Sequence, residues 1–370
     1  MTPSHQNRHR PHGSRRPRTP GALAAAALGG LLLLTACGGA PGADGLAADA
    51  PLPTAVSAGT TLVIADQSEA QQVALKASGE LSRLPFTAEF ANFTGGPAIL
   101  EAFRAGAADI ASVGDTPPIQ ALVAGEDVPI VLAKQNDPAG TQLAVAPGKA
   151  IRKLADLRGA KIAYAEGTAQ QVIVLRALAK AGLSTKDVEL VRLQLGDFND
   201  AVRTGQVDVA PLNEPRLTRF LAEAGPRGGG VIDPAETAGT SSGLNYLYAR
   251  REALQDPAKA AAIRAYVDHY IRSQQWINDH PEDWVQQYYV ANQGIDAADG
   301  KRIVDSLGPS TFPHLDAALV QRQQDTIDVI DRAGELPKRV RASDGFDLRF
   351  EQVAAETASA VGAGRERTGA

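Results

Sequence analysis

The sequence predicts an α/β fold made of two lobes. Short apolar runs rich in β-branched residues alternate with helical stretches of about ten residues, a pattern typical of a mostly parallel sheet covered by helices. The alternation begins at residue 60, restarts after residue 147, and is followed by a return strand and a long helical region. The chain of 370 residues is long enough for two domains with full cores.

The first lobe is expected to begin with a strand over 61–65, whose β-branched residues favour extended backbone. Ser68 can cap the helix that follows, and Gly79 can close it. The same alternation continues to residue 134. The expected strands of this lobe are 61–65, 86–93, 108–113 and 128–134, and the expected helices are 69–79, 98–106 and 118–125.

The second lobe repeats the alternation. Its expected strands are 141–147, 161–165, 188–193 and 207–211, and its expected helices are 151–159, 169–183, 198–205 and 215–225. A strand and turn over 244–254 returns the chain to the first lobe, and residues from Pro257 onward are almost all helical. The chain therefore crosses between the lobes near 141–146 and 243–248. Lobe 1 is predicted to be 60–142 plus 245–362, and lobe 2 to be 143–244.

The two ends are predicted to lie outside the fold. Residues 1–36 carry five arginines, no acidic residue, and an apolar run that ends at Leu34-Thr35-Ala36-Cys37. This is the pattern of a lipoprotein signal peptide, in which Cys37 would be lipidated and become the new N-terminus. Residues 37–59, rich in Gly, Ala, Pro and Asp, are predicted to be a flexible tether, and residues 363–370 a disordered tail.

Composition narrows the function. The net charge is −5, and it falls to −10 once residues 1–36 are removed, which argues against nucleic-acid binding. The chain has no Walker loop or dinucleotide fingerprint, no metal-ligand spacing, and no histidine beside the junction loops to serve a nucleophile. We therefore expect no cofactor, no metal site and no catalytic constellation. The spacing of Trp276 and Trp284 in a helical segment indicates that both are core residues.

Four strand-to-helix junctions have the chemistry of an anion site. In open α/β sheets, ligands bind at the carboxyl ends of strands, where helix N-termini offer free amides and a favourable dipole. Each junction alone could equally be a capped turn, and Asp115 or Thr116 is expected to cap its helix. The candidate ligand-binding residues at these junctions are Gln67, Ser68, Gly95, Gly96, Gly114, Asp115, Thr116, Gly167, Thr168 and Ala169. Strand ends beside the predicted cleft add Asn213, Glu214 and Asn245.

Three stretches resemble a known family. "NFTGGPAILEAFRAGAADIASVGDTPPI", "LADLRGAKIAYAEGTAQQVIVLRALAKAGL" and "GQVDVAPLNEP" are similar to segments of solute-binding proteins of ABC importers for aliphatic sulfonates and their nitrate- and taurine-type relatives. The resemblance covers about residues 60–345. It implies a type II periplasmic-binding-protein fold whose lobes close on a small anion held at helix N-termini of both lobes.

The resemblance has one departure. Relatives carry tryptophans in the segment where this chain has "VAPLNEP" (209–215), so an aromatic wall for the ligand is missing there. The implied function is an extracytoplasmic, lipid-anchored, monomeric protein that passes an organosulfur anion to a membrane permease. The alternatives are a binding protein for taurine, nitrate or another polar nutrient, a sensory module, and an enzyme on the same fold such as a pyrimidine-precursor synthase.

Overall fold

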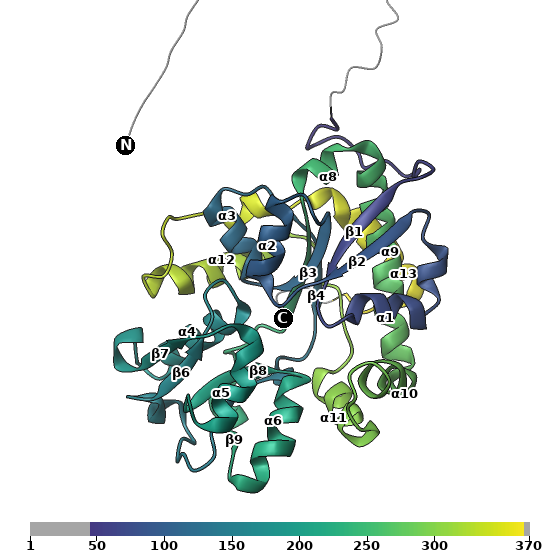
Figure 1. Ribbon diagram of the computed structural model, residues 1–370. Helices are drawn as coiled ribbons and strands as arrows, with labels where there is room; N and C mark the ends of the chain where they lie inside the picture. The colour runs from purple at the N-terminus through teal and green to yellow at the C-terminus, as the bar shows by residue number, and fades with distance from the viewer. Residues whose placement is uncertain (1–44, 366–370) are drawn as a thin grey trace, which may run out of the picture. The chain divides into compact units, whose positions relative to one another are not determined.

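A computed structural model describes residues 45–365, which contain two five-stranded sheets (Figure 1). The first sheet has the strand order β2-β1-β3-β10-β4. Its strands are β1 (Thr61–Asp66), β2 (Thr87–Asn92), β3 (Ile110–Gly114), β4 (Ile130–Gln135) and β10 (Leu244–Ala249). Strands β2, β1 and β3 are parallel, and β10 is antiparallel to both β3 and β4. The return strand therefore lies inside the first sheet.

The second sheet has the order β7-β6-β8-β5-β9 and repeats this design. Its strands are β5 (Thr141–Val145), β6 (Lys161–Tyr164), β7 (Glu189–Arg192), β8 (Val209–Asn213) and β9 (Gly230–Val231). Here β5 is the antiparallel strand, placed between β8 and β9. The fold class predicted from the sequence is confirmed: two mostly parallel sheets, each flanked by helices, form two lobes.

Helices cover the faces of both sheets. In the first lobe they are α1 (Ala70–Ala77), α2 (Gly96–Arg104) and α3 (Pro117–Ala124), and in the second α4 (Ala169–Lys180), α5 (Phe198–Thr204), α6 (Arg216–Ala224) and α7 (Pro234–Thr237). The C-terminal part contains α8 (Arg251–Gln255), α9 (Pro257–Asp279), α10 (Pro281–Trp284), a π-helix (Val285–Val290), α11 (Ala297–Leu307), α12 (Ala317–Arg332) and α13 (Glu351–Val361). Short 3₁₀ turns lie at Glu80–Arg83, Pro138–Gly140, Leu154–Leu157, Thr185–Asp187, Leu195–Asp197, Gly225–Arg227, Ala342–Gly345 and Leu348–Phe350.

The helix expected over 151–159 is instead the short turn Leu154–Leu157. The Asp156 carboxylate accepts the amides of Arg152 and Lys153, which fixes the start of a single turn. Gly159, at φ 76°, then turns the chain directly into β6. The segment therefore forms one 3₁₀ turn and not a helix, although its apolar residues follow a helical spacing.

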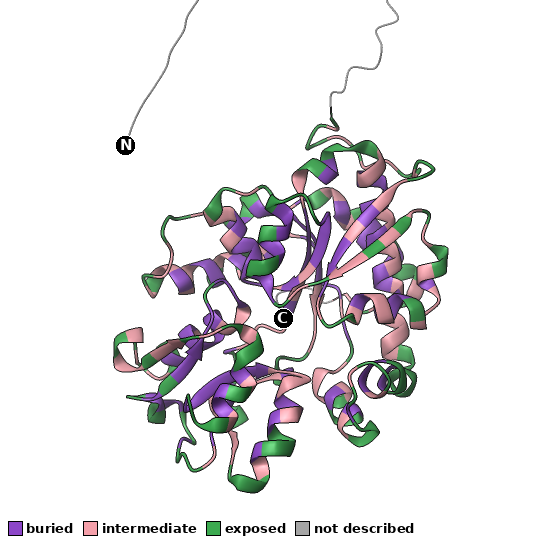
Figure 2. Cartoon of the chain, in the orientation of Figure 1, coloured by how far each residue is buried: buried purple, intermediate pink, exposed green. Residues whose placement is uncertain are grey.

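Each lobe has its own buried core, and in Figure 2 the buried residues gather on the central strands and on the helix faces that cover them, whereas β2 and β7 at the sheet edges are more exposed. Around the first sheet the core includes Ile64, Ile110 and Tyr266, and around the second it includes Ile162 and Val172. Both cores are apolar and fully enclosed, and their burial is the main favourable contribution to folding.

Helix α12 corrects the predicted division into lobes. Ile327 and Ile330 belong to the core of the second lobe, together with Ala342, and α12 packs on α4. Leu319, near the start of the same helix, belongs to the core of the first lobe. Helix α12 therefore packs against the cores of both lobes and not on the first alone, and Ile119 of α3 joins it in the core of the second lobe. Periodicity reveals an apolar stripe but does not say which core it covers.

The two ends of the described chain are more ordered than the sequence suggested. Leu46 N–H donates to the Gln255 carbonyl, and Arg349 donates to the carbonyls of Ala47 and Ala50. The tether prediction over 37–59 is thus wrong for residues 46–50. At the other end, Phe312 N–H donates to the Gly364 carbonyl, and Arg365 pairs with Glu351, so the tail prediction is wrong for 364 and 365.

The signal peptide (1–36), Cys37, the first part of the tether and the tail after residue 365 lie outside the described residues. Within 45–365, no helix is long and apolar enough to cross a membrane.

Candidate functional site

Two adjoining cavities lie where the strand ends of the first sheet face those of the second. The larger one, here called the outer chamber, has a volume of about 760 Å³, and the smaller inner chamber has about 160 Å³. The residues that line both chambers come from both lobes: Gln67, Thr141, Asn213, Arg216, Ser241, Gly243 and Asn245. Because they share this lining, the two chambers together form one cleft between the lobes.

Most of the residues expected at the site line this cleft. Ser68 and Glu214 line the outer chamber, and Gly95, Gly96, Gly114, Asp115, Thr168 and Ala169 line the inner one. Gln67, Asn213 and Asn245 line both. Two residues do not line either chamber, Thr116 and Gly167; the Thr116 side chain is fully buried and donates to Asp115.

The α1 N-terminus does not offer the free amides that the sequence suggested. The Asp66 carboxylate, at the end of β1, accepts the backbone N–H of Gln67, Gln71 and Gln72 at 2.7–3.1 Å. Burial raises the pKa of Asp66, and these three donors oppose that rise. An anion of the protein itself therefore occupies the first helix N-terminus of the predicted anion site.

The next two N-termini are also partly satisfied from within. Gly95 N–H donates to the Gln67 side-chain oxygen at 3.2 Å, and Gly167 N–H donates to the Gln171 side-chain oxygen at 2.9 Å. The Thr168 hydroxyl donates to the Ala165 carbonyl and accepts Gln171 N–H, so it acts as the cap of α4. The Asp66 carboxylate thus occupies the α1 N-terminus and Thr168 caps α4, whereas α2 and α3 have no side-chain cap.

Asp115 is not a helix cap, and neither is the Thr116 side chain. The Asp115 carboxylate accepts the Ser242 hydroxyl at 2.7 Å and lies 3.8 Å from the Arg176 guanidinium, while its backbone carbonyl accepts Gln323 of α12. Arg176 belongs to the second lobe and Ser242 to the crossing segment. Asp115 therefore ties the first lobe to the second behind the inner chamber.

Gly96 and Gly114 serve close approach between structural elements. A Cβ on Gly96 would lie 2.2 Å from Pro117 of α3, and a Cβ on Gly114 would lie 2.9 Å from Ala169 of α4. The second contact joins β3 of one lobe to the start of α4 in the other. The missing side chain at Gly114 makes room for the opposite lobe, where the sequence had suggested room for a ligand.

Two cations in the cleft were missed by the sequence analysis. Arg216, at the start of α6, lines both chambers, and Lys134, near the end of β4, lines the outer one. No carboxylate among the described residues lies within ion-pair distance of either group; Arg216 bonds to Asn213, and Lys134 donates to Gln274 at 3.0 Å. The sequence could have indicated both residues by their position, because each cation lies at or just beyond the carboxyl end of a strand, where ligands bind in α/β sheets.

Burial shifts the pKa values of these cations. It lowers the pKa of Arg216, and the charge of nearby Arg219 lowers it further. Burial also lowers the pKa of Lys134 to about 8. Both shifts mean that burial leaves the two positive charges poorly solvated, so an anion placed beside them would be favoured.

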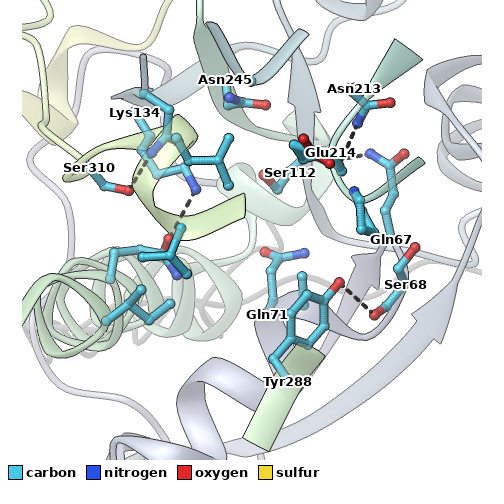
Figure 3. A pocket seen from close by; sticks show the side chains of 18 of the residues that line it. Gln67, Ser68, Gln71, Ser112, Lys134, Asn213, Glu214, Asn245, Tyr288 and Ser310 are labelled. Atoms are coloured by element: carbon cyan, nitrogen blue, oxygen red, sulfur yellow. Dashed lines mark hydrogen bonds between the residues drawn. The ribbon is translucent and has the colours of Figure 1, made fainter. Parts of the chain in front are cut away.

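Glu214 also faces the outer chamber, where Figure 3 shows it among Asn213, Gln67 and Ser112. Its carboxylate accepts Thr218 N–H at 3.1 Å in the first turn of α6. Burial raises the pKa of Glu214, and the bonds from Thr218 oppose the rise. The N-terminus of α6 therefore compensates the negative charge of this group.

Aromatic side chains do line the outer chamber, but they come from residues 284–289 and not from the 209–215 segment that carries tryptophans in the relatives. Trp284 and Tyr288 stack with ring centroids 4.5 Å apart and planes 10° apart, and both line the outer chamber. Trp284 is buried, as expected for a core residue, yet it also borders the cleft. The α10 and π-helix segment thus supplies indole and phenol rings that the 209–215 loop lacks.

A hydrogen-bonded clasp spans the rim of the outer chamber. Arg219 of the second lobe donates to the Gln293 carbonyl at 2.6 Å, and the Gln293 side chain donates to the Ser68 carbonyl at 3.2 Å. Tyr288 donates to the same carbonyl at 3.1 Å (Figure 3). Ser68 and its neighbour Glu69 have φ values of 56° and 59°, unusual for residues with a side chain. We name this set, Arg219, Gln293, Tyr288 and Ser68, the rim clasp.

The described residues contain no group of three or more His, Cys, Asp or Glu side chains placed to hold a metal ion. The chemistry of the cleft is instead that of recognition: two poorly solvated cations, several side-chain amides and a short aromatic wall. Such a cleft is suited to a small organic anion with a tail of some size.

Comparisons with known proteins agree on one family. A family model described as NMT1/THI5 like matches residues 92–284. A protein of Escherichia coli (strain K12) named for binding aliphatic sulfonates is 30% identical over 251 residues, which make up 67% of this chain and 75% of that protein.

Solved structures give the same answer. The alkanesulfonate-binding protein SsuA from Xanthomonas axonopodis pv. citri, bound to MOPS, matches with a TM-score of 0.70 and 25% identity over 78% of this chain and 99% of that one. The periplasmic aliphatic sulphonate binding protein SsuA from Escherichia coli matches with a TM-score of 0.67 and 26% identity over 79% of this chain and 100% of that one.

Proposed function

Since the chain belongs to the family of aliphatic sulfonate-binding proteins within the NMT1/THI5-like group, we propose that it captures an organic sulfonate between its two lobes. The observation that carries the proposal is the Arg216 guanidinium, which lines both chambers without a carboxylate partner among residues 45–365. A sulfonate is an anion at every physiological pH and would supply the missing negative charge.

The inner chamber is the proposed seat of the sulfonate group. It is small, it lies beside the N-terminus of the twelve-residue helix α4, and Arg216, Asn213 and Asn245 border it. Side-chain amides and a guanidinium are hydrogen-bond donors suited to sulfonate oxygens, and the α4 dipole adds to the attraction. The tail of the ligand would then extend into the outer chamber beside Trp284.

The lobes would close on the ligand and present it to a membrane permease. Residues from both lobes border each chamber, so a ligand in the cleft bridges them and favours the closed form. The relatives are named as binding proteins, and this supports a role without chemical turnover. Ligand recovered after incubation is therefore expected to have an unchanged mass.

Isothermal titration calorimetry tests the proposal. Methanesulfonate, propane-1-sulfonate, hexane-1-sulfonate, taurine, nitrate and sulfate form the panel. We expect the sulfonates with tails to bind at one site, and nitrate and sulfate to bind at least tenfold more weakly because they leave the outer chamber unfilled. Tight binding of nitrate with no binding of any sulfonate would contradict the proposal and favour another small anion as the ligand.

We also propose that the mature protein is a lipid-anchored monomer on the outer face of the membrane. The support is the sequence Leu34-Thr35-Ala36-Cys37 after an arginine-rich, apolar leader. Replacing Cys37 with serine is expected to abolish lipid attachment and to move the protein from the membrane fraction to the soluble fraction. Intact-mass spectrometry of the membrane-extracted protein provides the readout, and recovery of an unmodified wild-type Cys37 would rule out this anchor.

A further inference from the structure

Lys134 has no role in the binding of the sulfonate group as proposed above. Its ammonium group lines the outer chamber and donates a single hydrogen bond, to the neutral Gln274 side chain of α9, at 3.0 Å (Figure 3). An ammonium group has three N–H donors, so Lys134 retains donor capacity toward the chamber. No carboxylate among the described residues lies within 4 Å of it, as every ion pair found there involves other groups.

The other charged groups of the outer chamber are already compensated. The Asp66 carboxylate is held by three backbone amides, and Glu214 accepts an amide at the N-terminus of α6. Glu69 accepts Asn292 at the rim, and the Asp137 carboxylate accepts Ala139 N–H at 2.8 Å. Arg216 is assigned to the sulfonate group. With the sulfonate placed beside Arg216, Lys134 is the cation of the outer chamber that still has no negatively charged partner among the described residues.

Sheet register places Lys134 close to the passage between the chambers. Lys134 on β4 pairs directly with Asn245 on β10, and Asn245 lines both chambers. Side chains of directly opposite residues in an antiparallel pair share one face of the sheet, with Cβ atoms about 4.5–5.5 Å apart. A ligand with its sulfonate beside Asn245 would thus bring its next few atoms to Lys134.

We propose that the physiological ligand carries a second anionic or strongly accepting group, a few bonds away from the sulfonate, and that Lys134 recognises it. The inference rests on the proposed function and narrows its substrate class from simple alkanesulfonates to short sulfonates with a carboxylate or similar end. Lys134 is then the residue that determines specificity. Burial lowers its pKa to about 8, so it still carries its charge at neutral pH.

Three ligands with the same three-carbon chain test this inference by calorimetry at neutral pH: 3-sulfopropanoate, propane-1-sulfonate and 3-aminopropane-1-sulfonate. They differ only in a negative, apolar or positive second end. We expect 3-sulfopropanoate to bind about tenfold more tightly than propane-1-sulfonate, because it gains a charge-assisted hydrogen bond from Lys134. The amino compound is expected to bind most weakly.

The variant Lys134→Met keeps an unbranched side chain one atom shorter than lysine and removes its charge. It is expected to lose the tenfold preference for 3-sulfopropanoate over propane-1-sulfonate. The ratio of the two affinities is the readout, because loss of a positive charge in the cleft weakens the binding of both anions. Lys186→Met, at an exposed lysine of the second lobe, is the matched control and should retain the preference. An unchanged preference in Lys134→Met, or tighter binding of the amino compound by the wild type, would overturn the inference. Binding of none of the three would instead overturn the proposed function.

Discussion

Replacing Arg216 with alanine is expected to weaken the binding of propane-1-sulfonate by about 10- to 100-fold, the loss expected for one charge-assisted contact. The guanidinium lines both chambers, and its one side-chain hydrogen bond, to Asn213, is long at 3.4 Å. Its removal therefore takes away the charge that faces the ligand while breaking little of the fold.

Two further variants make this result specific. Arg216→Lys keeps the charge but loses the planar pair of donors, so an intermediate affinity is expected. Arg227→Ala removes an exposed guanidinium that donates to the backbone carbonyls of Glu223 and Arg203, outside the lining of the cleft, and should bind like the wild type. If Arg216→Ala bound propane-1-sulfonate as tightly as Arg227→Ala, the sulfonate would have to lie elsewhere.

Replacing Asp109 with alanine is expected to lower the free energy of unfolding by about 3 kcal/mol, the lower end of the range for breaking a buried ion pair. Asp109 is 1% exposed and precedes β3. Its carboxylate accepts Lys259 at 2.7 and 2.9 Å, Arg250 at 3.2 Å and Val63 N–H at 3.0 Å. It therefore connects β1, the end of β10 and α9, and its loss leaves two cations and an amide without their acceptor.

Differential scanning calorimetry of Asp109→Ala should show a melting temperature several degrees below that of the wild type. The matched control is Asp200→Ala, because Asp200 forms an i,i+3 ion pair with Arg203 but its side chain is 78% exposed. Exposed pairs contribute about 0–1 kcal/mol, so this variant should melt close to the wild type. Equal melting temperatures for the two variants would show that the buried network does not stabilise the first lobe.

The alternation of strands and helices could be predicted from the sequence because it depends on local periodicity and turn residues. Both sheets lie where the apolar runs predicted them, and the return strand at 244–249 brings Asn245 to the cleft as expected. The sequence was less informative where the packing of a helix depends on residues far away in the chain. Helix α12 shows a clear apolar stripe, but the sequence does not state that Ile327 and Ile330 would cover the second lobe.

Most of the residues that the sequence analysis proposed for the site line the cleft, but the two cations Arg216 and Lys134 were not among them. Most residues of the glycine-rich junctions line the cleft, and some nearby amides donate to Asp66, Gln67 and Gln171 of the protein itself. Asp66 directly precedes the first junction. A carboxylate at the end of that strand could have indicated that the amides of α1 would bind a side chain of the protein itself. Arg216 and Lys134 were overlooked because a lone cation in a sequence carries no sign of whether a carboxylate will pair with it.

The rim clasp has a consequence for how long a captured molecule stays. The carbonyl of Ser68 receives Tyr288 and Gln293, and Gln293 in turn receives Arg219 from the opposite lobe. Ser68 and Glu69 have positive φ, a conformation that costs about 1–3 kcal/mol for a residue with a side chain. Separation of the lobes at this rim has to break the bond from Arg219 to Gln293, so the residence time of a bound molecule would depend on that contact.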